Sequence, residues 1–239
     1  MMFWGVPGGF DSSYMIYLAI ALIVPMLAQM KLKSTFASFK QVRSFSGMTG
    51  AQVARRILDG NGLHQVPVVE IGGHLSDHYD PRQRVIRLSG DIYRGQSLAS
   101  AAVAAHEVGH AIQHEEGYAF LNFRSALFPV VNITSRLGIY AVFIGLMMEG
   151  LMGLAMLGVI MVGFTVLFQL VTLPVEFNAS SRAMVQLERF GVLRGGDEEA
   201  GAKKVLSAAA WTYVAGTVVA VAELVRLIFV LNNRNSRRR

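Results

Sequence analysis

The chain has 239 residues, of which 53% are hydrophobic and only 16% are charged. Soluble domains carry about 25% charged residues, and the apolar residues here are gathered into long runs, so the composition excludes an ordinary soluble domain and indicates an integral membrane protein. The net charge of +6 comes from basic residues that flank these runs, which favours a lipid bilayer over nucleic acid as partner, and the absence of cysteine excludes disulfides and cysteine-ligated zinc sites.

Residues 1–30 are predicted to form an N-terminal transmembrane anchor. The apolar run 14–30 is just long enough to cross the hydrocarbon core, which needs about 20 residues, and Lys31 and Lys33 follow it directly. No basic residue precedes the run, so it lacks the first part of a secretory signal. The basic residues after it place the N-terminus outside the cell.

Residues 31–124 form the first long polar region, which contains every histidine of the chain. Thr49 is placed to cap a short helix. Two segments with β-branched residues, 66–71 and 85–88, are predicted to be paired strands, and residues 72–84 are predicted to be the loop that connects them. This region is therefore expected to be a small α+β unit on the cytoplasmic side.

The sequence His106-Glu107-Val108-Gly109-His110 has the form H-E-x-x-H and lies in an alanine-rich run that favours a helix, with Ser97 as its N-cap. Residues four apart on a helix share one face, with Cβ atoms about 5–6 Å apart, so His106 and His110 can offer two imidazoles to one Zn²⁺ ion. Glu107 lies one position further round, where it can act on a water without being a ligand. The motif therefore indicates a zinc site in which Glu107 is placed to hold a metal-bound water.

Two further apolar runs, 127–148 and 151–173, are separated only by Glu149 and Gly150 and predict a transmembrane hairpin over residues 125–173. Residues 174–204 are polar again and are predicted to form a cytoplasmic helix, which starts near a proline. Residues 205–239 contain a last hydrophobic helix and end in a basic tail.

The hairpin returns the chain to the side that it left, so residues 31–124 and 174–204 face the same side of the membrane. Both are rich in Lys and Arg, which assigns that side to the cytoplasm. Four complete spans would then place the basic tail 237–239 outside, against this bias. Either the last run does not cross fully, with Glu223 and Arg226 near an interface, or the early spans set the orientation and the tail is an exception to the bias. Three to four transmembrane helices are therefore expected.

A catalytic zinc ion needs a third protein ligand. His114 cannot join the two motif histidines, because three residues spaced by four along a straight helix span about 12 Å; it is assigned to the surroundings of the site or to a loop. Glu115 and Glu116 follow the motif and are expected to be solvated. Glu176 comes directly after the hairpin, on the same side and at the same membrane depth as the motif, and this position favours a ligand over a surface anion.

Three motifs taken together resemble a known family: GHLSDHYDP at 73–81, AAHEVGHAIQ at 104–113 and LPVEFNASSRA at 173–183. With the order of the apolar runs, the likeness covers nearly the whole chain. The chain resembles the bacterial membrane-bound neutral zinc metallopeptidases of the YugP type and, more distantly, is similar to the HtpX-type zincin proteases.

The resemblance implies a mainly α integral membrane protein with a small α+β zincin-like catalytic region. It implies Zn²⁺ as cofactor, His106, His110 and Glu176 as its ligands, and Glu107 as the catalytic acid and base. In one respect the chain departs from the family, which usually carries Asp two positions after the ligand Glu, where this chain has Asn178. Such residues support the ligands by hydrogen bonds and tune the metal affinity.

The expected activity is zinc-dependent endopeptidase hydrolysis at the cytoplasmic face of the bacterial inner membrane, on polypeptides that could include membrane proteins under quality control. Tyr79, His78 and Arg182 are candidates to donate to the oxyanion, and their alternatives are loop hydrogen bonds for the first two and a salt bridge for the third. The strands 66–71 and 85–88 could offer an edge to an extended substrate. The alternative from another class is a catalytically inactive zincin-like scaffold or binding protein.

Overall fold

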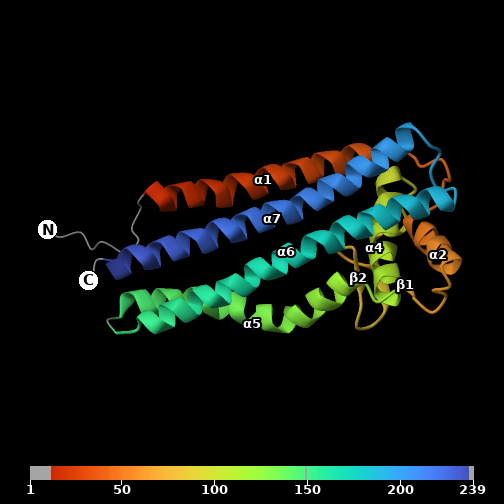
Figure 1. Cartoon of the computed structure of the whole chain (residues 1–239). Coiled ribbons are helices and arrows are strands. Elements are labelled where there is room, and N and C mark those ends of the chain that lie inside the picture. The colour runs from red at the N-terminus through yellow and green to blue at the C-terminus, as the bar shows by residue number, and fades with distance from the viewer. Residues whose placement is uncertain (1–11, 149, 237–239) are drawn as a thin grey trace. The chain divides into compact units, whose positions relative to one another are not determined.

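The computed structural model describes residues 12–148 and 150–236, in which seven helices and three short strands are found (Figure 1). In chain order these are α1 (Ser12–Lys40), α2 (Gly50–Gly60), β1 (Val68–Ile71), β2 (His78–Asp80), β3 (Val85–Ser89), α3 (Gly90–Tyr93), α4 (Leu98–Glu115), α5 (Ala119–Met147), α6 (Met152–Arg189) and α7 (Asp197–Ser236). The first part of the predicted anchor and the basic tail 237–239 lie outside the described residues.

The predicted fold class, mainly α with a small α+β region, is confirmed. Among the described residues, four helices are long and apolar enough to cross a membrane, namely Tyr14–Lys40, Ala119–Met147, Met152–Arg189 and Asp197–Arg234. This is the upper end of the predicted number of spans. A crossing needs about 20 residues, so each of the four helices extends beyond the length that a crossing requires.

The chain divides into two compact units, one with residues 1–28, 123–173 and 213–239 and the other with residues 29–122 and 174–212. In the first unit, small residues bring α5 and α6 into close contact. A Cβ atom built on Gly158 would lie 2.6 Å from the carbonyl oxygen of Gly138. Close backbone approach at small residues is typical of helix pairs in membranes, so this pair has the packing expected of a membrane hairpin.

Helix α6 continues from its apolar half into its polar half without a break. We predicted a helix start near Pro174, and this was wrong: α6 is continuous from Met152 to Arg189, with Pro174 inside it. A proline removes one backbone hydrogen bond and commonly ends a helix in water. It is tolerated in membrane helices, where neighbouring helices and local adjustments satisfy the freed backbone groups. Glu176 therefore lies within a long helix, not in its first turn.

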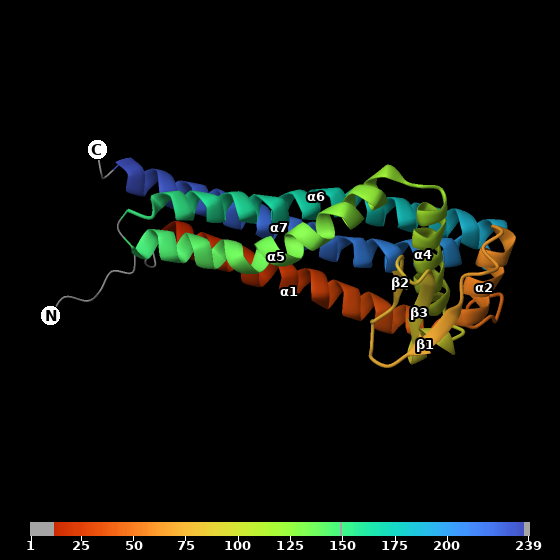
Figure 2. The same ribbon diagram turned by 90° about the horizontal axis from the view of Figure 1, so that it is seen from below.

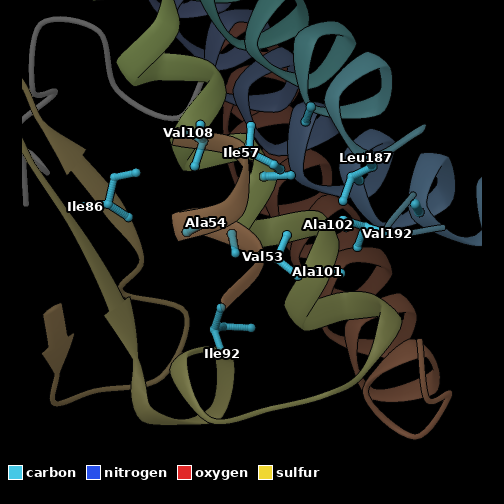
Figure 3. Close-up of a cluster of buried hydrophobic side chains, with 14 of the residues drawn as sticks. Val53, Ala54, Ile57, Ile86, Ile92, Ala101, Ala102, Val108, Leu187 and Val192 are labelled. Carbon is cyan, nitrogen blue, oxygen red and sulfur yellow. The ribbon is translucent and has the colours of Figure 1, made fainter. Parts of the chain in front are cut away.

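The second unit has a hydrophobic core between α2, α4 and the polar end of α6. Helix α2 begins with a capping box, in which the Thr49 hydroxyl accepts from the Gln52 N–H and the Gln52 side chain accepts from the Thr49 N–H; this confirms Thr49 as the predicted cap. The buried face of α2 consists of Val53, Ala54, Ile57 and Leu58. It packs against α4, as the close-up of this cluster shows (Figure 3).

The three strands form one sheet in the order β1-β3-β2, beside α4 (Figure 2). The predicted pairing of the first and last strands is confirmed, and the two run parallel, with Val68 opposite Ile86. The connection between them was predicted to be a loop, and this was wrong in part, since β2 lies within it and pairs antiparallel with β3. Strand β2 has only three residues, two of them polar, so it carries no β-branched signal.

Candidate metal centre

Helix α4 presents the whole H-E-x-x-H motif on regular backbone. Its N-cap is Ser97, as predicted, and the Ser97 hydroxyl accepts from the Ser100 N–H over 3.1 Å. Because the helix runs unbroken to Glu115, His106 and His110 lie one turn apart on the same face. Their rings meet edge to face, with the ring centres 4.7 Å apart.

Glu176 joins these two histidines from α6. Its Oε2 lies 3.3 Å from His106 Nε2 and 3.6 Å from His110 Nε2. One ligand atom from each of the three residues lies within 4.8 Å of the other two, and the Glu176 side chain is only 2% exposed. Two imidazoles and one carboxylate form a donor set of catalytic zinc sites, so the residues present fit a zinc ion.

The close approach of α6 to α4 depends on a glycine within the motif. A Cβ atom on Gly109 would lie 2.6 Å from the carbonyl oxygen of Ala179, so only glycine permits this separation without a shift. On α6, the residues Val175, Ala179 and Ala183 are fully buried. Small residues on both helices thus bring the carboxylate of Glu176 within reach of the imidazoles.

The outer nitrogens of both imidazoles are engaged by other side chains. Ser180 Oγ lies 3.2 Å from His106 Nδ1, and Gln113 Oε1 lies 3.0 Å from His110 Nδ1. Gln113 also donates through Nε2 to the carbonyl oxygen of Val175 over 2.8 Å. Both Nδ1 atoms are therefore held from outside, and both Nε2 atoms face the carboxylate. Such partners orient metal-binding histidines.

A hydrogen-bonded chain leads outward from Gln113. Asn178 Oδ1 accepts from Gln113 Nε2 over 2.9 Å and from Arg182 Nε over 2.7 Å. Arg182 also forms an ion pair with Glu116, with 2.7 Å between Arg182 NH2 and Glu116 Oε2. In both contacts Asn178 accepts through its side-chain oxygen, an atom that an aspartate would also supply. Having Asn178 where the family usually has Asp therefore keeps the acceptor but removes the negative charge.

Glu107 is buried beside the three candidate ligands. Burial raises the pKa of Glu107 to about 7, although the neighbouring His106 opposes the shift. The backbone N–H of Tyr79 in β2 donates to Glu107 Oε2 over 2.9 Å. A general acid or base works best when its pKa lies near the operating pH, so this carboxyl group is suited to taking up and releasing a proton.

The other predicted site residues make contacts away from the three candidate ligands. The Tyr79 hydroxyl lies 2.8 Å from His114 Nδ1, and burial raises the pKa of Tyr79 to about 12, so the hydroxyl keeps its proton. Burial also lowers the pKa of His114, which favours its neutral form. His78 Nδ1 lies 2.8 Å from the carbonyl oxygen of Ser76 in an exposed loop.

Sequence analysis missed three residues that support the site. Ser180 follows Glu176 by four residues and Gln113 follows His110 by three, so helical spacing could have indicated both. Asp77 accepts from the backbone N–H and the hydroxyl of Ser89, and thereby ties the segment before β2 to the end of β3. No spacing rule indicates this last contact, because it joins a loop to a strand.

Comparison with known proteins agrees with this geometry. Residues 14–232 match the model of the family described as "Putative neutral zinc metallopeptidase". The chain is also 50% identical over 222 residues, 92% of this chain and 98% of the relative, to the "Putative membrane protease YugP" of Bacillus subtilis (strain 168). No solved structure matches. With a family match over most of its length, the chain belongs to this family of neutral zinc metallopeptidases.

Proposed function

We propose that the chain is a zinc-dependent endopeptidase that hydrolyses peptide bonds at the cytoplasmic face of the bacterial inner membrane. The observation that carries the proposal is the convergence of His106, His110 and Glu176 from two helices, with Glu107 buried beside them. The two helices, α4 and α6, lie far apart in the sequence. A histidine pair with a purely structural role would not need a carboxylate from a second helix.

His106, His110 and Glu176 would hold the zinc ion, with Nε2 of each histidine turned inward. When bound, zinc supplies Lewis-acid chemistry that polarises a carbonyl group and lowers the pKa of water towards 7. Ser180 and Gln113 keep the two imidazoles in place through their Nδ1 atoms. The chain thus prepares the site before any substrate arrives.

Glu107 would move the proton in both halves of the reaction. Its carboxylate takes a proton from water as the water oxygen forms a bond with the carbonyl carbon, and it then gives the proton to the amine nitrogen as the C–N bond breaks. A carboxyl group with a pKa near 7 can do both at neutral pH. The Tyr79 N–H, bonded to Oε2, keeps the carboxyl group oriented.

The three residues predicted as possible oxyanion donors, Tyr79, His78 and Arg182, differ in the contacts that they make. His78 is bonded to its own loop and Arg182 to Glu116 and Asn178, which supports their alternative roles as a loop hydrogen bond and a salt bridge. Tyr79 alone touches the proposed catalytic carboxylate. Segment 85–88, which we predicted could offer an edge to a substrate, lies in the central strand β3 and has no free edge, so that part of the prediction was wrong. Strand β2, which carries Tyr79 at an edge of the sheet, is instead the strand beside which a polypeptide would lie.

The proposed side of the membrane and the proposed substrates are inferred from the membrane helices and the charges that flank them. The polar segments that carry the motif and Glu176 are rich in Lys and Arg, which favours the cytoplasm. Polypeptides that emerge from the bilayer on that side would reach a site held at the ends of membrane helices, so membrane proteins under quality control are the substrates proposed. A comparison of the proteomes of cells with wild-type protein and with the Glu107→Gln variant would identify them as polypeptides that accumulate in the variant.

The decisive experiment compares Glu107→Gln with Glu115→Gln on the same helix. In purified full-length protein, Glu107→Gln should keep one zinc ion per chain and lose activity on a quenched fluorescent polypeptide by about 10²–10⁴-fold. Glu115 is exposed and forms an ion pair with Arg84, so it should tolerate the change with zinc and activity retained.

Turnover by purified Glu107→Gln at the wild-type rate would exclude the mechanism. Zinc bound by the wild type without cleavage of any polypeptide would instead support the scaffold alternative. Loss of zinc in a His106→Ala variant links the metal to the motif.

A further inference from the structure

A groove lies between α1 and α7 in the second unit, where the two helices run side by side (Figure 1). Its volume is about 580 Å³, within the range of small-molecule sites, which is roughly 300–1,000 Å³. None of the zinc-site residues lines it. Helix α1 contributes Lys31 and three hydroxyl residues, and α7 contributes Lys203, Lys204 and Ser207.

The groove is strongly cationic. Three of its nine lining residues are lysines and none is acidic. Within the part of the chain that the structure describes, no carboxylate lies within ion-pair distance of Lys31, Lys203 or Lys204. Three ammonium groups gathered in one groove repel one another, and an anion between them would remove that repulsion. The charge therefore fits a phosphate.

The position of the groove along the two membrane helices indicates that the phosphate belongs to a lipid headgroup. Helix α1 leaves its apolar run at Lys31, and α7 enters its own apolar run directly after Lys204, so the groove lies where polar sequence meets apolar sequence on both helices. Trp211 lies at the same level, 52% exposed, with Lys31 Nζ 5.2 Å from its ring centre. Met30, the last residue before Lys31 in the apolar run, is 60% exposed. Lysine and tryptophan are typical of the level of lipid headgroups.

The hydroxyl groups add a preference for the headgroup itself. Ser34 Oγ donates to the carbonyl oxygen of Lys31 over 3.1 Å, and Ser38 Oγ donates to that of Ser34 over 2.9 Å. Since these hydroxyl hydrogens are engaged within the helix, the two oxygens remain as acceptors. The ammonium groups suit a phosphate, and the two serine oxygens can accept hydrogen bonds from hydroxyl groups. Together they suit a phospholipid headgroup that carries hydroxyl groups next to its phosphate.

We propose that this groove binds the headgroup of an anionic phospholipid with headgroup hydroxyls, such as phosphatidylglycerol. Lys31, Lys203 and Lys204 donate to the phosphate oxygens, and Ser34 and Ser38 accept from the headgroup hydroxyls. The acyl chains lie against the exposed apolar side chains next to the groove, of which Met30 and Trp211 are the nearest along their helices. The bound lipid would link α1 to α7 at the membrane surface.

Trp211 provides the measurement. The chain has two tryptophans, Trp4 and Trp211, so a Trp4→Phe background leaves one fluorophore, beside the groove. The full-length protein is reconstituted into phosphatidylcholine bilayers that contain phosphatidylglycerol, with one of the two lipids brominated in its acyl chains as a quencher. Phosphatidylglycerol should quench Trp211 with a relative binding constant roughly a hundredfold above that of phosphatidylcholine, because each of the three lysines favours an anionic lipid about fivefold and these factors multiply.

Matched double variants locate the effect. Lys203→Gln with Lys204→Gln should lower the preference to about fivefold, the share of the remaining Lys31, and leave the contact of Lys31 with Trp211 in place. Lys33→Gln with Arg56→Gln removes two exposed cations that do not line the groove, and it should keep the preference. Replacing Lys203 and Lys204 with Arg should also keep it, which separates loss of charge from loss of folding.

Three results would overturn the proposal. The first is equal quenching by the two brominated lipids in the Trp4→Phe protein. The second is an equal loss of preference in the two glutamine double variants, which would assign the effect to overall charge. The third is loss of the preference on adding inorganic phosphate at constant ionic strength, which would make the groove a site for free phosphate.

Discussion

The amide group of Gln113 determines which nitrogen of His110 faces Glu176. Gln113 Nε2 donates to the Val175 carbonyl, which can only accept, so the amide cannot be turned the other way round. Its Oε1 must then accept from His110 Nδ1. His110 therefore carries its proton on Nδ1 and presents the lone pair of Nε2 to the metal centre, as a zinc ligand requires.

Replacing Gln113 with Leu should lower zinc affinity by about 10–100-fold, the usual effect of removing such a partner. The leucine fills a similar volume but leaves His110 Nδ1 without its acceptor, so ring orientation and tautomer are no longer fixed. Competition with a chromophoric chelator measures the affinity. Gln186→Leu is the control, because Gln186 is also buried but bonds to Asn61 instead of a ligand. Equal zinc affinity in the two variants would contradict the role given to Gln113.

Gly109 sets the distance between α4 and α6. In Gly109→Ala the new Cβ would meet the Ala179 carbonyl at 2.6 Å, so α6 must shift and carry Glu176 away from the histidines. We expect weaker zinc binding together with a loss of about 1–3 kcal/mol in the free energy of unfolding. Thermal unfolding in detergent and zinc titration would measure these two effects.

The control for this change is Gly163→Ala in α6. A Cβ there would meet nothing within 4 Å, so alanine should leave zinc binding unchanged and stabilise the helix by about 0.5–1 kcal/mol. If Gly109→Ala bound zinc as tightly as Gly163→Ala, the close approach of the helices would not be what brings the ligands together.

At the scale of elements, the sequence predicted those with a strong periodic or capping signal. The caps Thr49 and Ser97 and the pairing of the strands are found as predicted. Strand β2 was missed because its three residues form a strand only through their pairing with β3. We missed that α6 continues through Pro174, because we applied the rule that a proline ends a helix in water. Pro174 lies at the edge of an apolar run, where leaving the helix would expose unsatisfied backbone groups to the bilayer and is therefore more costly.

Helices α1 and α7 are joined in the first unit by a partly buried ionic cluster. Arg226 forms two hydrogen bonds with Glu223, of 2.8 and 2.9 Å, and its guanidinium lies 5.5 and 5.0 Å from the ring centres of Tyr14 and Tyr17 of α1. A paired charge is far less costly in an apolar run than a single one. The cluster lets two charged residues lie within the last apolar helix and fastens that helix to the first.

A double-mutant cycle tests this cluster. Arg226→Leu leaves the partly buried Glu223 carboxylate without its cation and should destabilise the protein by about 1–3 kcal/mol, whereas Glu223→Leu with Arg226→Leu should be close to neutral. Thermal unfolding of the full-length protein in detergent would give both values. Arg136→Leu serves as control, because Arg136 lies exposed on α5. A double variant as unstable as Arg226→Leu alone would show that the pair stabilises the helices beyond neutralising its own charges.

At the scale of the whole molecule, the candidate site is made by two segments that the membrane hairpin separates in sequence. The sequence could predict that Glu176 and the motif share one side, because the hairpin crosses twice. Helical spacing places Gln113 beside His110 and Ser180 on the face of Glu176, but the contact of Ser180 with His106 could not be predicted, because it depends on how α6 lies against α4. Motif and topology thus indicate the candidate ligands, while helix packing determines their support.

Four spans have a consequence for the C-terminus that can be measured. Because the number is even, the chain should end on the side where it begins, opposite the candidate metal centre, even though residues 237–239 are arginines. The chain has no cysteine, so one cysteine at position 56 or 233 is a unique label. In spheroplasts an impermeant maleimide should label Asn233→Cys at once and Arg56→Cys only after lysis. Labelling of both only after lysis would mean that α7 does not cross the membrane and that three helices cross.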